Sequence, residues 1–299
     1  MQQINNILVA VDRDGSRVAL AKAIAVARLF GARLELFLCD AESAYEQKHQ
    51  YDPRSATLAR DSSLFGAREY LESLWRSFSA DDVAVTMDVA CETPLYEGIL
   101  HKLRRSAPQL VVRGASGREG RIFGAGDWDL AQSCPVPLLL TKGRLWDARP
   151  VIAAAVDVSS EESPALTHSI LGLAKRFAEV GHGTLEVLHA GHFYEPETLA
   201  WHRAKLEERA REAGVAPAAL HLIDGEPATA LTEFAAACHY DLMVLGALTH
   251  RKALTALLGT LTGHLIDTIE SDVLLVKPAA RSCNADRTTD SLMADSPAA

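Results

Sequence analysis

The feature that most constrains the fold is an internal repeat, in which one succession of short apolar segments occurs in each half of the chain. Residues 6–12 read Asn-Ile-Leu-Val-Ala-Val-Asp, and residues 151–157 read Val-Ile-Ala-Ala-Ala-Val-Asp. Each copy is followed by a turn rich in Ser and Asp, and then by an alanine-rich amphipathic segment, residues 18–30 and residues 165–180. A short apolar run is typical of a buried strand, and the longer amphipathic segment is typical of a helix. The repeat therefore predicts strand–helix units in both halves.

Later landmarks keep the same order in the two halves. The matching segments are residues 34–38 and 184–188, residues 110–115 and 242–247, and residues 137–142 and 272–277. Strands that alternate with helices form βαβ units and a parallel sheet. We therefore predict an α/β protein with two tandem domains, residues 1–147 and residues 148–280. Residues 281–299 contain few apolar side chains, which predicts a disordered tail.

A glycine-hinged loop in the second half is the strongest indication of a function. The loop has the spacing Gly246-x2-Thr249-x9-Gly259-Thr260, and Thr262 follows. We expect Gly259 to begin a helix, where free backbone N–H groups and the helix dipole favour an anion such as a phosphate. In the alternative interpretation the segment is an ordinary strand–loop–helix joint, and the two hydroxyl residues beside Gly259 cap the helix.

These segments resemble the universal stress protein family, whose nucleotide-binding members carry Gly-x2-Gly-x9-Gly-Ser/Thr at this place, with Thr249 here replacing the second glycine. The resemblance is to the tandem, two-domain branch and extends over nearly all of residues 4–278. It implies two Rossmann-like domains of the adenine nucleotide α-hydrolase type. Each would be a five-stranded parallel sheet of order 3-2-1-4-5, flanked by helices, with ATP at the carboxyl edge. The implied nucleotide-binding residues are Asp157, Ala190, Gly246, Thr249, Gly259, Thr260 and Thr262.

Asp157 has a physical reason to contact a ligand. It ends a buried strand at the point where the strand order reverses, and its carboxylate can accept a hydrogen bond from an adenine amino group or a ribose hydroxyl. The alternative is that Asp157 caps the turn that follows it, through Ser159 and Ser160.

The first half carries a degenerate version of the same site. Its counterpart residues are Asp12, Gly114, Gly117 and Gly124. The loop is shorter, no hydroxyl residue follows the last glycine, and Asp127 stands where the second hydroxyl would be. A carboxylate at a helix N-terminus interacts favourably with the dipole and repels a phosphate. We expect Arg113 to reach Asp127 or Asp12, and we expect this site to be closed to ATP.

Patterns for catalysis or for metal binding are weak. The sequence contains neither a Gly-x-Ser-x-Gly segment nor a Walker-type loop with Lys before the hydroxyl residue. His189 and His192 flank the end of the second strand of the second half and are weak candidates for metal ligands that would need a third partner. Histidines at the rim of a sheet are the alternative, and we assign no metal. Any ATPase activity would be slow, because no general base is indicated.

Composition narrows the class of protein further. The net charge of −9 gives no electrostatic footprint for a nucleic-acid partner, and no apolar run is long enough to span a membrane. Five scattered cysteines suit a reducing cytoplasm. Together with this composition, the family resemblance implies a cytoplasmic stress-response protein that binds ATP or a similar phosphorylated ligand in its second domain. The alternatives are an adenine-nucleotide-hydrolase-type enzyme with slow ATPase activity, and an interaction scaffold without a ligand.

Three further expectations concern assembly and connections. The fifth strands, residues 137–141 and residues 273–277, can pair inside one molecule to form a pseudo-dimer, and a homodimer of such chains stays possible. Trp146, between the domains, is expected to pack against one of them. The stretch from Asp40 to Arg54 is interpreted as an irregular loop that either covers a pocket or is inert.

Overall fold

The computed structural model describes residues 3–13, 16–48, 52–114, 124–158, 163–216, 218–247, 266 and 268–278. The strands of the first half are β1 (Asn6–Val11), β2 (Arg33–Cys39), β3 (Val85–Ala90), β4 (Leu110–Gly114) and β5 (Leu138–Thr141). Its helices are α1 (Ser16–Phe30), α2 (Ala41–Lys48), α3 (Pro53–Arg76), α4 (Leu95–Ser106) and α5 (Ala125–Ser133). The strands of the second half are β6 (Val151–Ala155), β7 (Thr184–Gly191), β8 (Ala219–Asp224), β9 (Leu242–Gly246) and β10 (Asp272–Val276). Its described helices are α6 (Pro164–Val180), α7 (Pro196–Glu212) and α8 (Pro227–Ala237).

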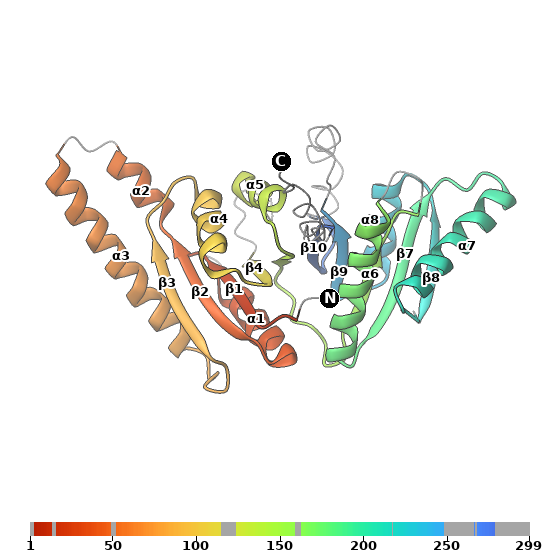
Figure 1. Ribbon diagram of the computed structural model, residues 1–299, viewed down its shortest axis with the longest axis horizontal. Coiled ribbons are helices and arrows are strands. Elements are labelled where there is room, and N and C mark those ends of the chain that lie inside the picture. Colours follow the sequence, from red (N-terminus) through yellow and green to blue (C-terminus); the bar gives the residue numbers. More distant parts are fainter. Residues whose placement is uncertain are drawn as a thin grey trace, which may run out of the picture.

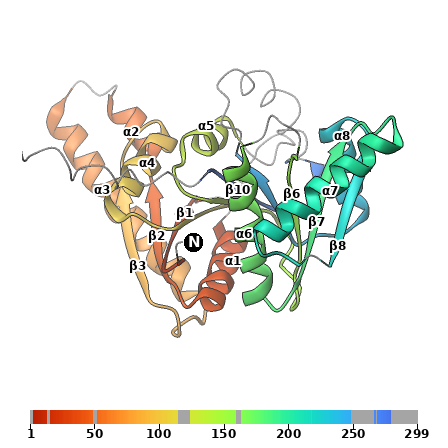
Figure 2. The ribbon, with the colours of Figure 1, turned by 45° about the vertical axis from the view of Figure 1, so that its right-hand side comes forward.

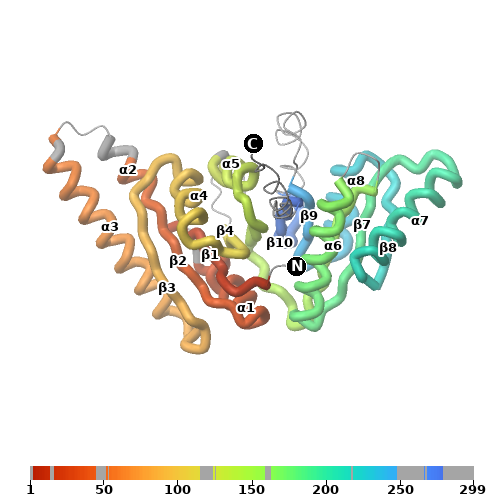
Figure 3. Tube along the Cα trace, in the orientation of Figure 1, coloured from red at the N-terminus to blue at the C-terminus, as the bar shows by residue number. Residues whose placement is uncertain are grey.

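The strands form one continuous sheet in the order β3-β2-β1-β4-β5-β10-β9-β6-β7-β8. Within each half all pairs are parallel, and the order is third, second, first, fourth, fifth strand, as the family resemblance implied. Figure 1 shows the two halves side by side, with α3 and α7 at the two outer ends. Figure 3 follows the chain as it passes from one half to the other through the segment between β5 and β6.

The two halves meet through their fifth strands. β5 and β10 pair antiparallel, with Val273 opposite Leu140 and Leu275 opposite Leu138. The predicted intramolecular pseudo-dimer is therefore confirmed. Each fifth strand would otherwise be an open edge, and this pairing covers both of them.

Alternation along the strands divides the core between the two faces of the sheet. Along β1, Ile7, Val9 and Val11 face a cluster that includes α1, α3, α6 and α7, whereas Leu8 and Ala10 face a cluster that includes α4, α5 and α8. Successive side chains of a strand point to opposite faces, so a strand covered on both sides is apolar throughout. In Figure 2 α1 and α6 lie next to each other on one face. Phe30, which ends α1, and Phe177, in the last turn of α6, make an edge-to-face contact with ring centroids 4.9 Å apart.

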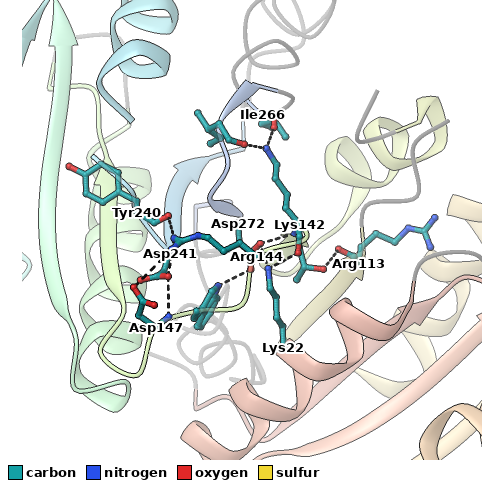
Figure 4. A network of polar contacts seen from close by, with 12 residues as sticks. Lys22, Arg113, Lys142, Arg144, Asp147, Tyr240, Asp241, Ile266 and Asp272 are labelled. Carbon is teal, nitrogen blue, oxygen red and sulfur yellow. Dashed lines mark hydrogen bonds and ion pairs between the residues drawn. The ribbon is translucent and has the colours of Figure 1, made fainter. Parts of the chain in front are cut away.

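A buried polar network joins the halves at the β5–β10 junction (Figure 4). Lys22 Nζ of α1 lies 2.6 Å from Asp272 Oδ1 of β10, and the two side chains are 3% and 1% exposed. Asp272 also accepts hydrogen bonds from the backbone N–H of Lys142 at 2.7 Å and from Trp146 Nε1 at 2.8 Å. The indole of Trp146 packs against Phe177 as well, so the expectation that it packs against a domain is confirmed.

Two further lysines connect the halves, one donating from the first half to the second and one from the second half to the first. Lys142, after β5, donates to the carbonyls of Ile266 and Ile269 in the second half. Lys277, after β10, donates to the carbonyl of Gln132 in the last turn of α5 in the first half. A cation beside the carbonyls at the end of a helix interacts favourably with the helix dipole. Each half thus supplies a lysine that donates to backbone carbonyls of the other half.

The interpretation of Asp40–Arg54 as an irregular loop was wrong, because α2 occupies residues 41–48 and α3 begins at Pro53. Asp40 accepts hydrogen bonds from the backbone N–H of Ser43 at 3.0 Å and from its hydroxyl at 2.9 Å, at the start of α2. Asp52 caps α3 in the same way, with Pro53 in the first turn. Both helices therefore begin at Asp caps, a signal that the aromatic and polar composition of the stretch obscured.

Candidate functional site

The candidate site of the second half lies at the carboxyl edge of its strands. Asp157 comes two residues after β6, Ala190 is near the end of β7, and Gly246 ends β9. β6 pairs in parallel with both β7 and β9, so the ends of the three strands meet at one edge of the sheet. The side chain of Asp157 is 48% exposed, and Ala190 and Gly246 are partly buried.

Gly246 has a packing role that is independent of any ligand. A Cβ at this position would lie 2.9 Å from Cδ2 of Leu166 and 3.4 Å from Cδ1 of Ile170, both on α6. The glycine therefore lets α6 approach the end of β9. Its presence in the loop motif is explained by this close approach as well as by the proposed ligand.

The remaining predicted contacts of the second half lie outside the described residues. These are Thr249, Gly259, Thr260 and Thr262, and Gly117 of the first half also lies outside them. The phosphate-binding role of the loop therefore stays a prediction.

The two histidines that were weak metal candidates take different environments. His189 is 2% exposed, and its ring hydrogen-bonds to the carbonyl of Val156 through Nδ1 at 3.0 Å and to His202 Nδ1 through Nε2 at 2.8 Å. His192 is exposed and stacks on the ring of Tyr194, with centroids 5.3 Å apart. Across the described residues, no group of three His, Cys, Asp or Glu side chains could hold a metal ion. Here His189 takes His202 as its partner, and we do not assign it a metal.

Sequence reasoning missed His202, which lies on α7 and had no motif to distinguish it. Its ring stacks near that of His189, with centroids 4.9 Å apart. Burial lowers the pKa of His189, against opposing contributions from the Val156 carbonyl and from Asp157, whose Oδ1 lies 4.0 Å from Nδ1. The ring of His189 is therefore favoured in its neutral form at the candidate edge.

The first half replaces this arrangement with a buried ion cluster. Arg113, at the end of β4, lies 2.6 Å from Asp12 Oδ2 through Nη1 and 2.8 Å from Asp127 Oδ1 through Nε. The prediction that Arg113 reaches these carboxylates is confirmed. Asp127 Oδ2 also accepts a hydrogen bond from the backbone N–H of Gly124 at 2.9 Å, and Gly114 is buried at the end of β4. The carboxylate of Asp127 thus takes a backbone donor at the start of α5 that an anion would otherwise use.

Burial and charge act in opposite directions on the guanidinium of Arg113. Burial alone lowers its pKa, but Asp12 and Asp127 more than compensate and the pKa is raised. Arg113 is therefore a permanent cation in the first half. Position 245, its counterpart in the repeat, is Leu. In the register of the sheets Phe37 pairs with Ala10 as Leu188 pairs with Ala155, so the next residue, Leu38, occupies the place of His189. The two carboxyl edges differ in the identity and position of their basic group.

Comparison with known proteins agrees with this architecture. A sequence model described as the universal stress protein family matches residues 3–142 and again residues 150–277. The chain belongs to the universal stress protein family. Universal stress protein E of Photorhabdus laumondii is 21% identical over 95% of this chain and 98% of its own length. Universal stress protein E of Escherichia coli K12 is 22% identical over 93% of this chain and 95% of its own length. The crystal structure of a universal stress protein from Archaeoglobus fulgidus, 15% identical, superposes with a TM-score of 0.69 over 92% of this chain and 97% of that one.

The family assignment covers both halves, so the protein is a tandem universal stress protein similar to the E type. None of the helices in the described ranges is long and apolar enough to cross a membrane.

Proposed function

We propose that this universal stress protein acts in the cytoplasmic stress response by binding ATP, or a similar phosphorylated ligand, at the carboxyl edge of its second half. The observation that carries the proposal is the contrast between two equivalent aspartates. Asp12 is 22% exposed and lies 2.6 Å from the permanent cation of Arg113, whereas Asp157 is 48% exposed. A hydroxyl or amino group of a ligand can approach the second carboxylate more readily than the first.

The edge around Asp157 supplies complementary groups for an adenosine. The carboxylate can accept hydrogen bonds from ribose hydroxyls or an adenine amino group, and the ends of β6, β7 and β9 form a parallel-sheet edge of the kind that binds nucleotides. The sequence then supplies Gly259, Thr260 and Thr262 for the phosphates. In this proposal each chain binds one nucleotide, because the first half presents Asp127 in place of phosphate donors.

The test is calorimetry of ATP binding to the full chain and to the variant Gly259→Asp. The added carboxylate would lie among the donors meant for phosphate, where like charges about 4 Å apart repel by about 4 kcal/mol at an effective dielectric of 20. That repulsion corresponds to a loss of affinity of about a thousandfold. Stability should change by about 1 kcal/mol or less, because Asp is an acceptable helix cap.

The matched control is Gly124→Asp, the same change at the equivalent place of the first half. Gly124 is exposed with φ −84, and a Cβ there would come no closer than 3.8 Å to Asp127 Oδ2. This variant should bind ATP as the parent does. Equal binding by Gly259→Asp and the parent would refute the phosphate site, and two ATP molecules per chain would refute the closed first half.

Mass spectrometry of the native protein identifies any nucleotide that co-purifies, and release of phosphate from bound ATP would favour the slow ATPase alternative.

A further inference from the structure

The first half of α7 makes few contacts with the body of the protein. Between residues 196 and 205 every residue is exposed except His202 and Lys205, which are half-buried. The buried contacts of the helix begin further along, at Leu206 and Ala210. Figure 1 shows α7 at the outer end of the sheet, beside β7 and β8. The hydrogen bond from His202 to His189 therefore connects an otherwise exposed part of the helix to the carboxyl edge of β7.

The partners of the two rings determine where their protons lie when both are neutral. The carbonyl of Val156 can only accept, so Nδ1 of His189 carries a hydrogen and Nε2 of the same ring is an acceptor. Nδ1 of His202 must then donate to that Nε2 across 2.8 Å. The remaining nitrogen of the pair, Nε2 of His202, is the one that can take a proton without breaking either hydrogen bond.

Aromatic rings shield the pair, and one carboxylate faces it. Phe193 lies 5.8 Å from the ring of His189 and 5.2 Å from that of His202, and Trp201 packs edge-on against His202 at 4.8 Å. Among the described residues, the charged group that acts on His189 is Asp157, which follows β6. Through His189, the histidine pair thus connects α7 to the aspartate of the candidate site.

We propose that the His189–His202 pair is a pH-sensitive connection that holds the first half of α7 against the edge of β7 and so regulates the ligand site of the second half. One proton on Nε2 of His202 leaves the connection intact. A second proton, on Nε2 of His189, places two N–H donors and two positive charges at the former hydrogen bond, which must then open. Acidification therefore releases the start of α7 from the edge of β7.

The direction of the pH dependence follows from burial. Since burial lowers the pKa of His189, the unfolded or opened chain binds a proton more readily than the closed one. The connection contributes its full stability above the pKa of an exposed histidine, about 6.5, and loses it as the pH falls through the lower pKa of the closed form. The ligand part of this inference rests on the proposed function, whereas the opening of α7 does not.

Hydrogen exchange of the full chain, followed by mass spectrometry at about pH 7.5 and about pH 5 and corrected for intrinsic rates, measures the opening directly. Exchange in residues 196–205 should accelerate on acidification by up to about tenfold per pH unit for each proton taken up. Exchange in α1 of the first half serves as the internal reference. ATP affinity of the same samples should weaken in parallel.

Two variants separate this connection from simple loss of structure. His202→Asn keeps a donor near the position of Nδ1, and its amide can turn to accept from a protonated His189, so exchange should stay slow at both pH values. His202→Phe keeps the ring but removes the hydrogen bond, so exchange should be fast at both. Unchanged protection of the parent between the two pH values, or an equal acid response in His202→Asn, would overturn the proposal. If α7 opens as described but ATP binds at neither pH, the connection stands and the nucleotide function fails.

Discussion

The buried ion pair between Lys22 and Asp272 gives the sharpest test of how the halves are held together. At 2.6 Å and an effective dielectric of 20, the attraction between two unit charges is about 6 kcal/mol. Burial opposes it: burial lowers the pKa of Lys22 and raises that of Asp272, although each partner pulls the other back towards its charged form. The intact pair therefore contributes far less than the attraction alone, because removing two ions from water costs several kcal/mol for each.

Removal of one partner of the pair leaves an uncompensated charge in the core. Such a change usually lowers the free energy of unfolding by about 3–5 kcal/mol. For Lys22→Met we expect about 3 kcal/mol, the lower end, because Lys142 N–H and Trp146 Nε1 still donate to Asp272. Asp272→Asn should lose about 2 kcal/mol, since the amide oxygen keeps part of these hydrogen bonds. The double variant should lose at least about 1.5 kcal/mol less than the sum of the two.

Urea unfolding of the four full-length proteins, followed by circular dichroism, provides the free energies for this cycle. The matched control is the pair Arg28–Asp82, which has the same shortest N–O distance of 2.6 Å but side chains that are 46% and 56% exposed. Water screens that pair, so Arg28→Met with Asp82→Asn should show a much smaller coupling. Additive losses for Lys22→Met and Asp272→Asn, or equal couplings for the two pairs, would refute the view that burial makes the junction pair important.

Two other predictions follow from the packing of the sheet. Gly246→Ala should destabilise the protein by about 1 kcal/mol, because its Cβ would lie 2.9 Å from Cδ2 of Leu166. Adding Leu166→Ala to the same chain should relieve the clash. Thermal unfolding of the two single variants and of the double variant measures the effect. Light scattering should give the mass of one chain, 32.3 kDa, since β5 and β10 already cover each other's edges. A stable tetramer would contradict the second expectation.

Most of the fold could be predicted because most of its strands are short apolar runs that recur in both halves. The third strands, β3 and β8, had no such signal. Their residues are half-buried rather than fully apolar, and they include Asp88 and His221. An edge strand that borders the core on one side and solvent on the other does not show the continuous apolar pattern of a central strand. For these strands the repeat predicted their position in the strand order of the sheet, but not the residues at which they begin and end.

The candidate site was predictable only where the backbone determines the outcome. The apolar pattern locates β6, which Asp157 follows, and β9, which Gly246 ends. Arg113 was identified as a cation that replaces a leucine of the repeat. The His189–His202 hydrogen bond could not be predicted in this way. It depends on the rotamer of one ring in β7 and on the rotation of α7 about its axis, and neither is determined by the spacing of residues along the chain.

The two basic groups give the halves different responses to the same conditions. Arg113 remains charged across the physiological range, so the first half keeps its carboxylates neutralised at any pH at which the protein is folded. His189 occupies a different strand end in the second half and changes its charge with pH, and Asp157 beside it is more exposed than Asp12. Because the β5–β10 junction joins the halves into one sheet, the first half can serve as a fixed support. In the function that we propose, binding and its response to pH are confined to the second half.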